Sequence, residues 1–451
     1  MNKSMRLKIY VLLIIFFLTA PVVSGLQTSK KEKEILINYS VDPLIFDMIN
    51  QVNESLLYFY LKGLIDIGPR FTGSSNCEKA AEYINDEFKS MGLHSFIQLW
   101  TYLRRKCQNV VATLNGTDPS SDAVFIICAH YDTITYPLLL PKKEHSVGAN
   151  DDGSGVAAMM TVAKIFSESS FNHTIKFIAF SGEEVGCFGS HYYARKAYEN
   201  DENIIAVLNL DTIGYAYTEK EGNMFKLWLP ERSEWIYDFV TNICEKYNDF
   251  FNLQVKYVPT FGCDHGSFID YGYDGVLFGQ YAFLEGIHTP EDIIDKINFT
   301  YLEKITKCVL TTLYELANKP IELQVRIINP REGYFHFFNR KPIRLPQFNS
   351  IRLKYNGLTF ILGRTTAKVE VISSKEVDTI VFVLDGESAP KTTYSNKTEW
   401  TINGFARPLF GRHTLGVYVY TSSGKMAYDE MDLFVVTFRY DFKFIFPRKQ
   451  H

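Results

Sequence analysis

The chain has 451 residues, 46% of them hydrophobic, and a formal net charge of −4. This length exceeds one ordinary domain, and the apolar content is ample for a real core, so we expect two folded domains. The slightly negative charge, without any basic stripe, excludes nucleic acid as an expected partner.

The N-terminus has the layout of a targeting segment. Basic residues precede the apolar run Ile9 to Ala20, and the small residues Ser24 and Gly25 follow. This order predicts a secretory signal peptide over residues 1–25, cleaved near Gly25. The alternative is an uncleaved membrane anchor, although Pro21 interrupts the run. We therefore expect a secreted or cell-surface protein, with membrane anchoring through this segment left open.

Two further features bear on the compartment. Acceptors of the Asn-x-Ser/Thr type agree with export, and they include Asn38, Asn53, Asn115, Asn172, Asn298 and Asn396. The seven cysteines are scattered, with no zinc-finger spacing, and their odd number leaves at least one unpaired within the chain. The sequence assigns neither a disulfide pairing nor an oligomeric state.

The first elements come before any candidate site. Residues 32–62 have the periodicity of two short helices, and the loop 68–73 is rich in turn residues. An amphipathic helix is predicted over 76–91, and strands over 109–114 and 123–129.

The second of these strands ends in the triplet His130-Tyr131-Asp132. Residues two apart in an extended segment share a face, so Asp132 can hydrogen-bond the His130 ring. A carboxylate behind a histidine is typical of a metal ligand, since it fixes the ring tautomer and raises its basicity. Taken alone, the triplet fits a hydrogen-bonded surface pair better.

Two further acidic pairs follow. Asp151 and Asp152 lie among glycines just before a helix predicted over 156–168; they either cap that helix or turn their oxygens outward as ligands. Glu183 and Glu184 follow the strand 174–180 and a glycine. Adjacent carboxylates repel unless a cation lies beside them, so one could bind a metal while the other moves protons.

The pattern of a strand followed by an acidic residue then recurs. The helix 190–198 leads to the strand 204–210, which ends at Asp211, and a helix is predicted over 235–247. A polar, glycine-rich loop over 261–268 contains Asp264 and His265, and it precedes a strand over 275–278. His288 stands before a proline turn, and a helix over 299–317 closes the unit.

Alternating strands and helices predict an α/β domain over 32–318, with a mostly parallel or mixed central sheet flanked by helices. In such sheets ligands bind beyond the carboxyl ends of the strands. His130, Glu183, Glu184 and Asp211 all follow predicted strands, so one crevice could collect them. Residues 321–440 change to short β segments separated by turns, which predicts a β-sandwich domain.

Five motifs in order now resemble a known family. They are HYD at His130, GANDDGSGVA at Gly148, FSGEEVGCFGS at Phe180, NLDTIG at Asn209 and HTPED at His288. The stretch 68–317 resembles the di-zinc exopeptidases that include secreted leucyl aminopeptidases. The C-terminal part is similar to immunoglobulin-like modules.

The resemblance implies a role for each matching residue. One Zn²⁺ would be bound by His130 and Asp211 and a second by Glu184 and His288, with Asp151 bridging both. Glu183 would be the general base. Asp132 and Asp152 would support the ligands, the Asp151-Asp152 peptide would be cis, and the loop with Asp264 and His265 would lie near the substrate.

The implied activity is hydrolysis of a peptide bond at a free terminus, by an aminopeptidase using two zinc ions per chain. Mixed histidine and carboxylate ligation suits zinc without excluding cobalt or manganese. The alternatives are a carboxypeptidase or dipeptidase on the same metals, glutaminyl cyclisation on a single zinc, and a non-catalytic ectodomain. No GxSxG or HExxH motif supports a different hydrolase.

Two departures from the family are visible. Ile287 stands where some relatives have a tyrosine just before the last histidine, and the protease-associated insertion of some relatives is missing. The C-terminal module could be a passive spacer or could bind glycan, envelope or substrate. Whether Tyr136, His145 or Tyr281 shapes the specificity pocket is also left open.

Overall fold

The computed structural model describes residues 43–136, 145–259, 262–283, 286–321, 323–344, 359–373, 375–388, 398–402 and 408–437. The predicted targeting segment and the acceptors Asn38 and Asn396 lie outside these ranges. In the described part of the chain, no helix combines the length and the apolar character that crossing a membrane requires.

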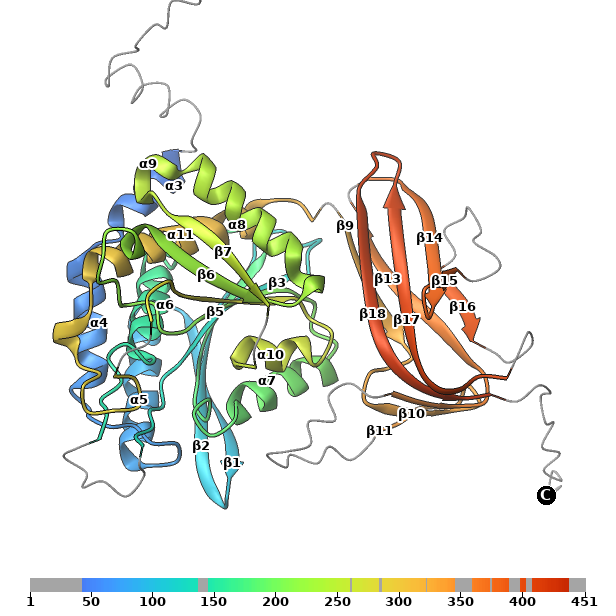
Figure 1. The fold of residues 1–451 in the computed structure, drawn as a ribbon, viewed down its shortest axis with the longest axis horizontal. Coiled ribbons are helices and arrows are strands. Elements are labelled where there is room, and N and C mark those ends of the chain that lie inside the picture. The colour runs from blue at the N-terminus through green and yellow to red at the C-terminus, as the bar shows by residue number, and fades with distance from the viewer. Residues whose placement is uncertain are drawn as a thin grey trace, which may run out of the picture. The chain divides into compact units, whose positions relative to one another are not determined.

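The first described region is a mixed eight-stranded sheet with helices on both faces (Figure 1). The strand order is β1-β2-β4-β3-β5-β8-β6-β7. The strands are β1 (His94–Tyr102), β2 (Arg105–Leu114), β3 (Val124–His130), β4 (Thr174–Phe180), β5 (Ile204–Leu210), β6 (Met224–Leu229), β7 (Gln254–Pro259) and β8 (Gly275–Gln280). The helices are α3 (Pro43–Gln51), α4 (Glu54–Ile65), α5 (Ser75–Ser90), α6 (Gly153–Phe166), α7 (Phe188–Glu199), α8 (Glu234–Lys246), α9 (Asn248–Phe251), α10 (Asp264–Ile269) and α11 (Phe299–Asn318).

The two faces of the sheet are covered by different helices because successive side chains of a strand point in opposite directions. On β4, Phe177 meets Phe88 of α5, with ring centroids 6.2 Å apart. Its neighbours Ile178 and Phe180 point to the other face and share a core with residues of α7 and α10, including Phe268. Burial on both faces explains the nearly continuous apolar sequence of β3, β4 and β5.

The predicted α/β fold with a mixed central sheet is confirmed, with changes at the margins. Strands β3, β4, β5 and β8 are parallel, whereas β1, β2 and β6 bring antiparallel pairs. The sequence did not predict β1, β6 or β7. The predicted loop over 261–268 is wrong in part, because Asp264–Ile269 forms the short helix α10.

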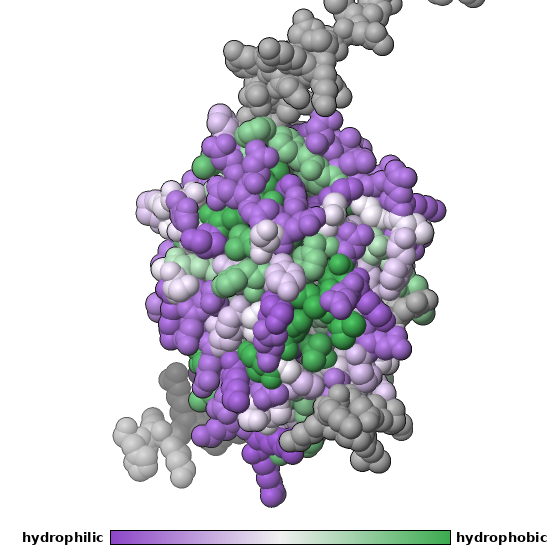
Figure 2. All heavy atoms as spheres, turned by 90° about the vertical axis from the view of Figure 1, so that its left-hand side faces the viewer, coloured by the Kyte–Doolittle hydropathy of each residue, from purple (hydrophilic) through white to green (hydrophobic). Residues whose placement is uncertain are grey.

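The face of the molecule on which α4 lies is mainly hydrophilic, with hydrophobic side chains between the polar ones (Figure 2). Two aromatic residues of this helix, Tyr58 and Phe59, are 46% and 57% exposed. The Tyr58 ring lies 5.6 Å from that of Phe299, which covers part of it.

The C-terminal part forms two further sheets, of seven and three strands. Its strands are β9 (Leu323–Asn329), β10 (Tyr334–Phe337), β11 (Ile343–Arg344), β12 (Thr359–Leu362), β13 (Thr365–Ser373), β14 (Val377–Leu384), β15 (Glu387–Ser388), β16 (Glu399–Ile402), β17 (Phe410–Thr421) and β18 (Met426–Val436). Residues of both sheets contribute to one hydrophobic core, among them Val369 of β13 and Val417 of β17. A separate C-terminal region of sheets is therefore present, while its immunoglobulin-like identity and the domain boundaries stay predictions.

One glycine near the candidate site leaves no room for a larger residue. A Cβ on Gly189, in the first turn of α7, would lie 2.1 Å from the Ser181 carbonyl oxygen and 2.5 Å from Asn109 Oδ1. We expect Gly189→Ala to lower the free energy of unfolding by roughly 1–3 kcal/mol, because backbone must shift to admit the methyl group. Gly222→Ala is the matched control, since nothing lies within 4 Å of a Cβ there. Equal denaturation midpoints for the two variants would contradict this expectation.

Candidate metal centre

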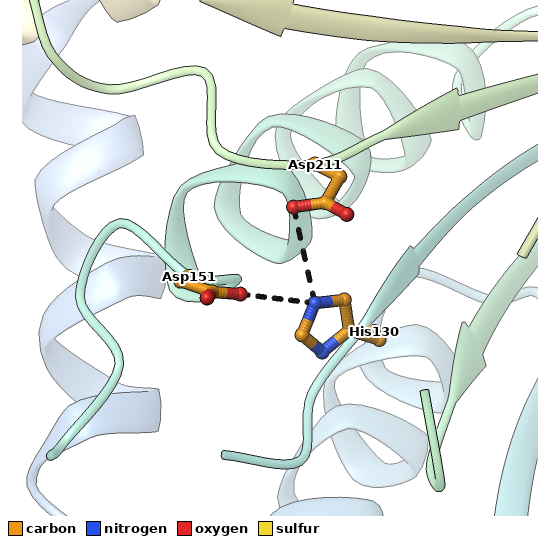
Figure 3. Close-up of side chains that lie close together, drawn as sticks. All are labelled: His130, Asp151 and Asp211. Carbon is orange, nitrogen blue, oxygen red and sulfur yellow. Dashed lines mark ion pairs between the residues drawn. The ribbon is translucent and has the colours of Figure 1, made fainter. Parts of the chain in front are cut away.

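The carboxyl ends of three neighbouring strands bring the predicted ligands together. His130 ends β3, Asp211 follows β5, and Glu183 and Glu184 lie in the loop after β4. Asp151 comes from the loop before α6, and Figure 3 shows it facing the His130 ring together with Asp211. Residues more than 150 positions apart in the sequence thus converge on one site.

Asp151 lies between the two histidines. Its Oδ1 is 3.1 Å from His130 Nε2, and its Oδ2 is 3.0 Å from His288 Nε2. Asp211 Oδ1 is 3.9 Å from His130 Nε2, and Glu184 Oε2 is 3.0 Å from His288 Nε2. Two groups of potential ligand atoms result, His130-Asp151-Asp211 and Asp151-Glu184-His288, and within each group the atoms lie within 4.8 Å of one another.

The donor set fits divalent cations better than it fits a purely hydrogen-bonded cluster. His130 Nε2 is buried and, although Asp151 Oδ1 lies 3.1 Å away, makes no hydrogen bond of suitable geometry to the described residues. Glu184 Oε1 is likewise buried and makes none to them. Burial, reinforced by neighbouring carboxylates, raises the pKa of Glu184 to about 7. The same burial is the main cause that raises the pKa values of Asp211 and Glu183. Crowded buried carboxylates of this kind are stabilised when a cation lies between them.

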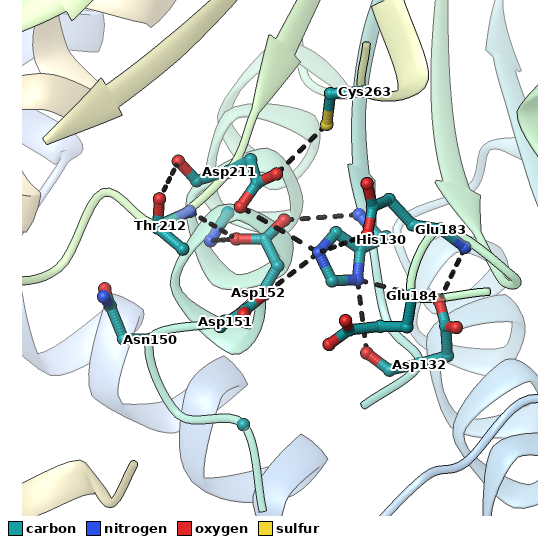
Figure 4. Close-up of polar contacts among 12 residues, drawn as sticks. His130, Asp132, Asn150, Asp151, Asp152, Glu183, Glu184, Asp211, Thr212 and Cys263 are labelled. Atoms are coloured by element: carbon teal, nitrogen blue, oxygen red, sulfur yellow. Dashed lines mark hydrogen bonds and ion pairs between the residues drawn. The ribbon is translucent and has the colours of Figure 1, made fainter. Parts of the chain in front are cut away.

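The two predicted supporting carboxylates are buried next to the ligands (Figure 4). Asp152 accepts hydrogen bonds from the backbone N–H groups of His130 (3.2 Å), Gly155 (2.9 Å) and Thr212 (3.2 Å). It therefore caps α6 and also ties β3 to the segment after β5. The Asp151-Asp152 peptide is cis, as the resemblance implied.

The contact between Asp132 and His130 differs from the prediction. His130 Nδ1 lies 3.2 Å from the backbone carbonyl oxygen of Asp132 and 3.6 Å from its carboxylate Oδ1, so the carbonyl is the closer partner. The Asp132 carboxylate instead accepts hydrogen bonds from Thr72 Oγ1 (2.6 Å) and from the backbone N–H of Glu183 (3.3 Å). It thereby links the loop after β3 to the loop that carries Glu183.

The two residues predicted near the substrate lie at the start of α10. Asp264 and His265 are both 0% exposed, so this conformation gives them no surface open to solvent. The residue of this segment that reaches the ligands is Cys263, whose Sγ donates to Asp211 Oδ2 at 3.1 Å. A substrate role for Asp264 and His265 stays a prediction.

Arg70 is a supporting residue that the sequence did not reveal. Its side chain is fully buried and donates to backbone carbonyl oxygens of both ligand-bearing loops: Nε to Tyr131 (2.6 Å), Nη1 to Val147 (2.6 Å) and Nη2 to Gly148 (3.2 Å). The guanidinium therefore holds the loop after β3 against the loop before α6. Its only sequence signal was a position in a turn-rich loop, where an arginine is usually exposed.

Asp292 was also missed, although it lies in the HTPED motif. Its carboxylate accepts from the backbone N–H groups of Asn150 (2.7 Å) and Asp151 (3.1 Å) and from the Tyr215 hydroxyl (2.9 Å). This buried side chain therefore fixes the backbone of Asp151, the residue that lies between His130 and His288.

Comparison with known proteins agrees with this geometry. Residues 109–313 match the model of peptidase family M28, a range that contains every predicted ligand and all strands of the eight-stranded sheet except β1 and the start of β2. The chain contains a domain of peptidase family M28. The predicted resemblance to metal-dependent exopeptidases is thereby confirmed for this domain.

Individual relatives are distant. Aminopeptidase YwaD of Bacillus subtilis is 27% identical over 229 residues, covering 49% of this chain and 48% of the relative. The probable aminopeptidase YDR415C of Saccharomyces cerevisiae is 24% identical over 314 residues, covering 64% and 82%. The chain spans about half the length of the first two curated relatives it matches.

Solved structures share the fold of the M28 domain. LapB from Legionella pneumophila superposes with a TM-score of 0.55 at 21% identity, covering 62% of this chain and 76% of that one. The aminopeptidase from Aneurinibacillus sp. strain AM-1 has a TM-score of 0.53 at 18% identity, covering 62% and 98%.

Proposed function

We propose that this protein is an exported aminopeptidase that binds two zinc ions and removes residues from the free N-terminus of peptides. The observation that carries the proposal is Asp151, whose two oxygens face His130 and His288 at 3.1 and 3.0 Å. One carboxylate between two histidines suits a pair of cations that share a ligand. The three ligand carboxylates carry three negative charges and the two histidines are neutral, so the four positive charges of two Zn²⁺ ions would more than offset the repulsion among these carboxylates.

In the proposed site, His130 and Asp211 would hold one zinc, Glu184 and His288 would hold the other, and Asp151 would be available to both. Bound zinc would polarise the scissile carbonyl and lower the pKa of the attacking water. Glu183 would accept the proton of that water and pass it to the leaving amine. Its side chain is 17% exposed, against 4% for Glu184, so it is the member of the pair that can reach a substrate.

Aminopeptidases are favoured over carboxypeptidases and dipeptidases because the proteins that this chain resembles include bacterial and fungal aminopeptidases. Export is part of the same proposal and is supported by the N-terminal sequence and the glycosylation acceptors. The segment 321–440 is proposed as an appended domain, either a spacer or a binding module.

The test combines metal content with a substrate panel. We expect purified protein to contain about two zinc ions per chain, in line with the paired ligand groups. It should hydrolyse unblocked aminoacyl-p-nitroanilides and leave N-acetylated peptides intact. Removal of metal by a chelator should abolish this activity, and Zn²⁺, Co²⁺ or Mn²⁺ should restore it. Cleavage of N-acetylated peptides at their free C-terminus would favour a carboxypeptidase, and well-folded protein with less than one zinc per chain would favour a non-catalytic role.

A further inference from the structure

Three lysines converge on the ring of Tyr281, just beyond the end of β8. The Nζ atoms of Lys220, Lys226 and Lys256 lie 5.8, 5.4 and 5.9 Å from the ring centroid. Lys220 comes from the loop before β6, Lys226 from β6 and Lys256 from β7. Amines at this distance are attracted by the face of the ring, which explains why three of them can gather there.

The positive charge of this group has no acidic partner in the described part of the chain. The recorded side-chain contacts of the three lysines are with aromatic rings: Tyr281, and Trp228 for Lys226. Lys226 and Lys256 are direct partners in the β6-β7 register. Like charges directly opposite each other in a sheet are unfavourable. Partial burial, and then the charge of Lys256, lowers the pKa of Lys226. A bound anion would relieve this repulsion.

The three lysines and the metal centre lie at the same end of the sheet, where β3, β4, β5 and β8 have their carboxyl ends. Asp211 follows β5, and the strand order continues β5-β8-β6-β7. Because β6 is antiparallel to β8, Lys226 lies opposite Gly279, next to the carboxyl end of β8. Neighbouring strands are ~4.8 Å apart, so Lys226 and Lys256 lie about 10 and 14 Å along this end of the sheet from the strand that carries Asp211.

Hydrogen bonds of the neighbouring residue also connect Tyr281 to the loop that carries Asp151. The preceding residue, Gln280, accepts from Asn150 Nδ2 (3.1 Å) and from the Tyr215 N–H (2.9 Å) through Oε1. Asn150 is adjacent to Asp151, and the backbone N–H of Tyr281 donates to the Tyr301 hydroxyl oxygen at 3.2 Å. The position of Tyr281 is therefore fixed relative to the candidate metal centre.

We propose that Lys220, Lys226, Lys256 and Tyr281 form a subsite that binds a carboxylate of the peptide substrate. The inference rests on the proposed aminopeptidase function. An aminopeptidase has one residue on the acyl side of the cleaved bond, so a carboxylate at this distance belongs to the leaving peptide. An extended chain advances ~3.4 Å per residue, which places the carboxylate roughly two to four residues beyond the cleaved bond. It is either an acidic side chain or the C-terminus of a short peptide.

The experiment compares peptides that differ in one charge. Leu-Ala-Ala-Asp-amide and Leu-Ala-Ala-Asn-amide test an acidic side chain, and Leu-Ala-Ala-Ala with a free or amidated end tests a terminal carboxylate. We expect kcat/KM to favour the charged member of at least one pair, and the double substitution K226Q/K256Q to lower that preference about fivefold, as two partly exposed ion pairs would. Raising the salt concentration should weaken the preference in the wild type.

The matched control is K79Q/K89Q, which removes two exposed lysines from α5 and should leave the preference unchanged. If K226Q/K256Q shows the same charge preference as the wild type, or if the wild type has none, the subsite is refuted and Lys256 merely protects the edge strand β7. A failure of the proposed function is recognised separately, because leucine-p-nitroanilide then goes uncleaved. In that case the subsite is tested by equilibrium binding of the same peptides to the Glu183→Gln protein. Adding K226Q/K256Q to that protein should lower its preference for the charged peptide about fivefold.

Discussion

Glu183→Gln is expected to lower kcat by about 10²–10⁴-fold while metal content stays as in the wild type. In the wild type, Glu183 Oε2 lies 3.9 Å from His130 Nε2, which places the carboxylate beside the ligands. The amide keeps the shape of the side chain but cannot accept a proton from water. Turnover of an aminoacyl-p-nitroanilide and zinc content of the same preparation are the two measurements.

The neighbouring glutamate supplies the control. Glu184 contacts His288 at 3.0 Å and belongs to a ligand group, so Glu184→Gln should lower the zinc content together with the activity. Near-normal turnover of Glu183→Gln would show that another group accepts the proton. Loss of zinc in Glu183→Gln would instead make Glu183 a ligand, a role its position beside Asp211 and Cys263 would allow.

Arg70→Met is expected to lower the free energy of unfolding by roughly 3–5 kcal/mol, because leaving one buried acceptor without its donor costs about 1–3 kcal/mol and three acceptors are affected. The methionine fills much of the space but donates no hydrogen bond, so the carbonyls of Tyr131, Val147 and Gly148 lose their donor. Since these carbonyls lie in the segments next to the ligands His130 and Asp151, zinc affinity should fall about 10–100-fold as well. Chemical denaturation and competition for zinc with a chelating dye measure the two effects.

Arg104→Met is the matched control, because Arg104 is exposed and its loss removes the same charge. It should stay within about 0.5 kcal/mol of the wild type, as is usual for surface substitutions. Arg70→Lys separates charge from geometry, because lysine keeps the charge without the fork of donors that reaches three carbonyls. Wild-type zinc affinity in a folded Arg70→Met protein would contradict the positioning role.

The sequence predicted the elements that show a regular pattern within a short stretch of the chain. The buried strands β4 and β5 have the predicted bounds, because each is a short apolar run limited by polar residues. Strands β6 and β7 were missed, since each is partly exposed and carries lysine among its apolar residues, which weakens the signal of a buried strand. Helix α10 was interpreted as a loop because its six residues are too few to show helical periodicity.

The chemistry of the candidate centre could be predicted from the sequence because acidic and histidine residues stood at the ends of apolar strands, and parallel strands end at one edge of a sheet. The supporting residues could not. Arg70 and Asp292 act through backbone atoms that lie more than 60 and 140 positions away, and nothing in their own neighbourhoods distinguishes them from surface charges. Likewise, Lys220, Lys226 and Lys256 form one group only because β6 pairs with both β7 and β8. The residue types thus determined which chemistry is available, whereas tertiary structure decided what holds the ligands and where unpaired charge gathers, because both depend on contacts between segments distant in the chain.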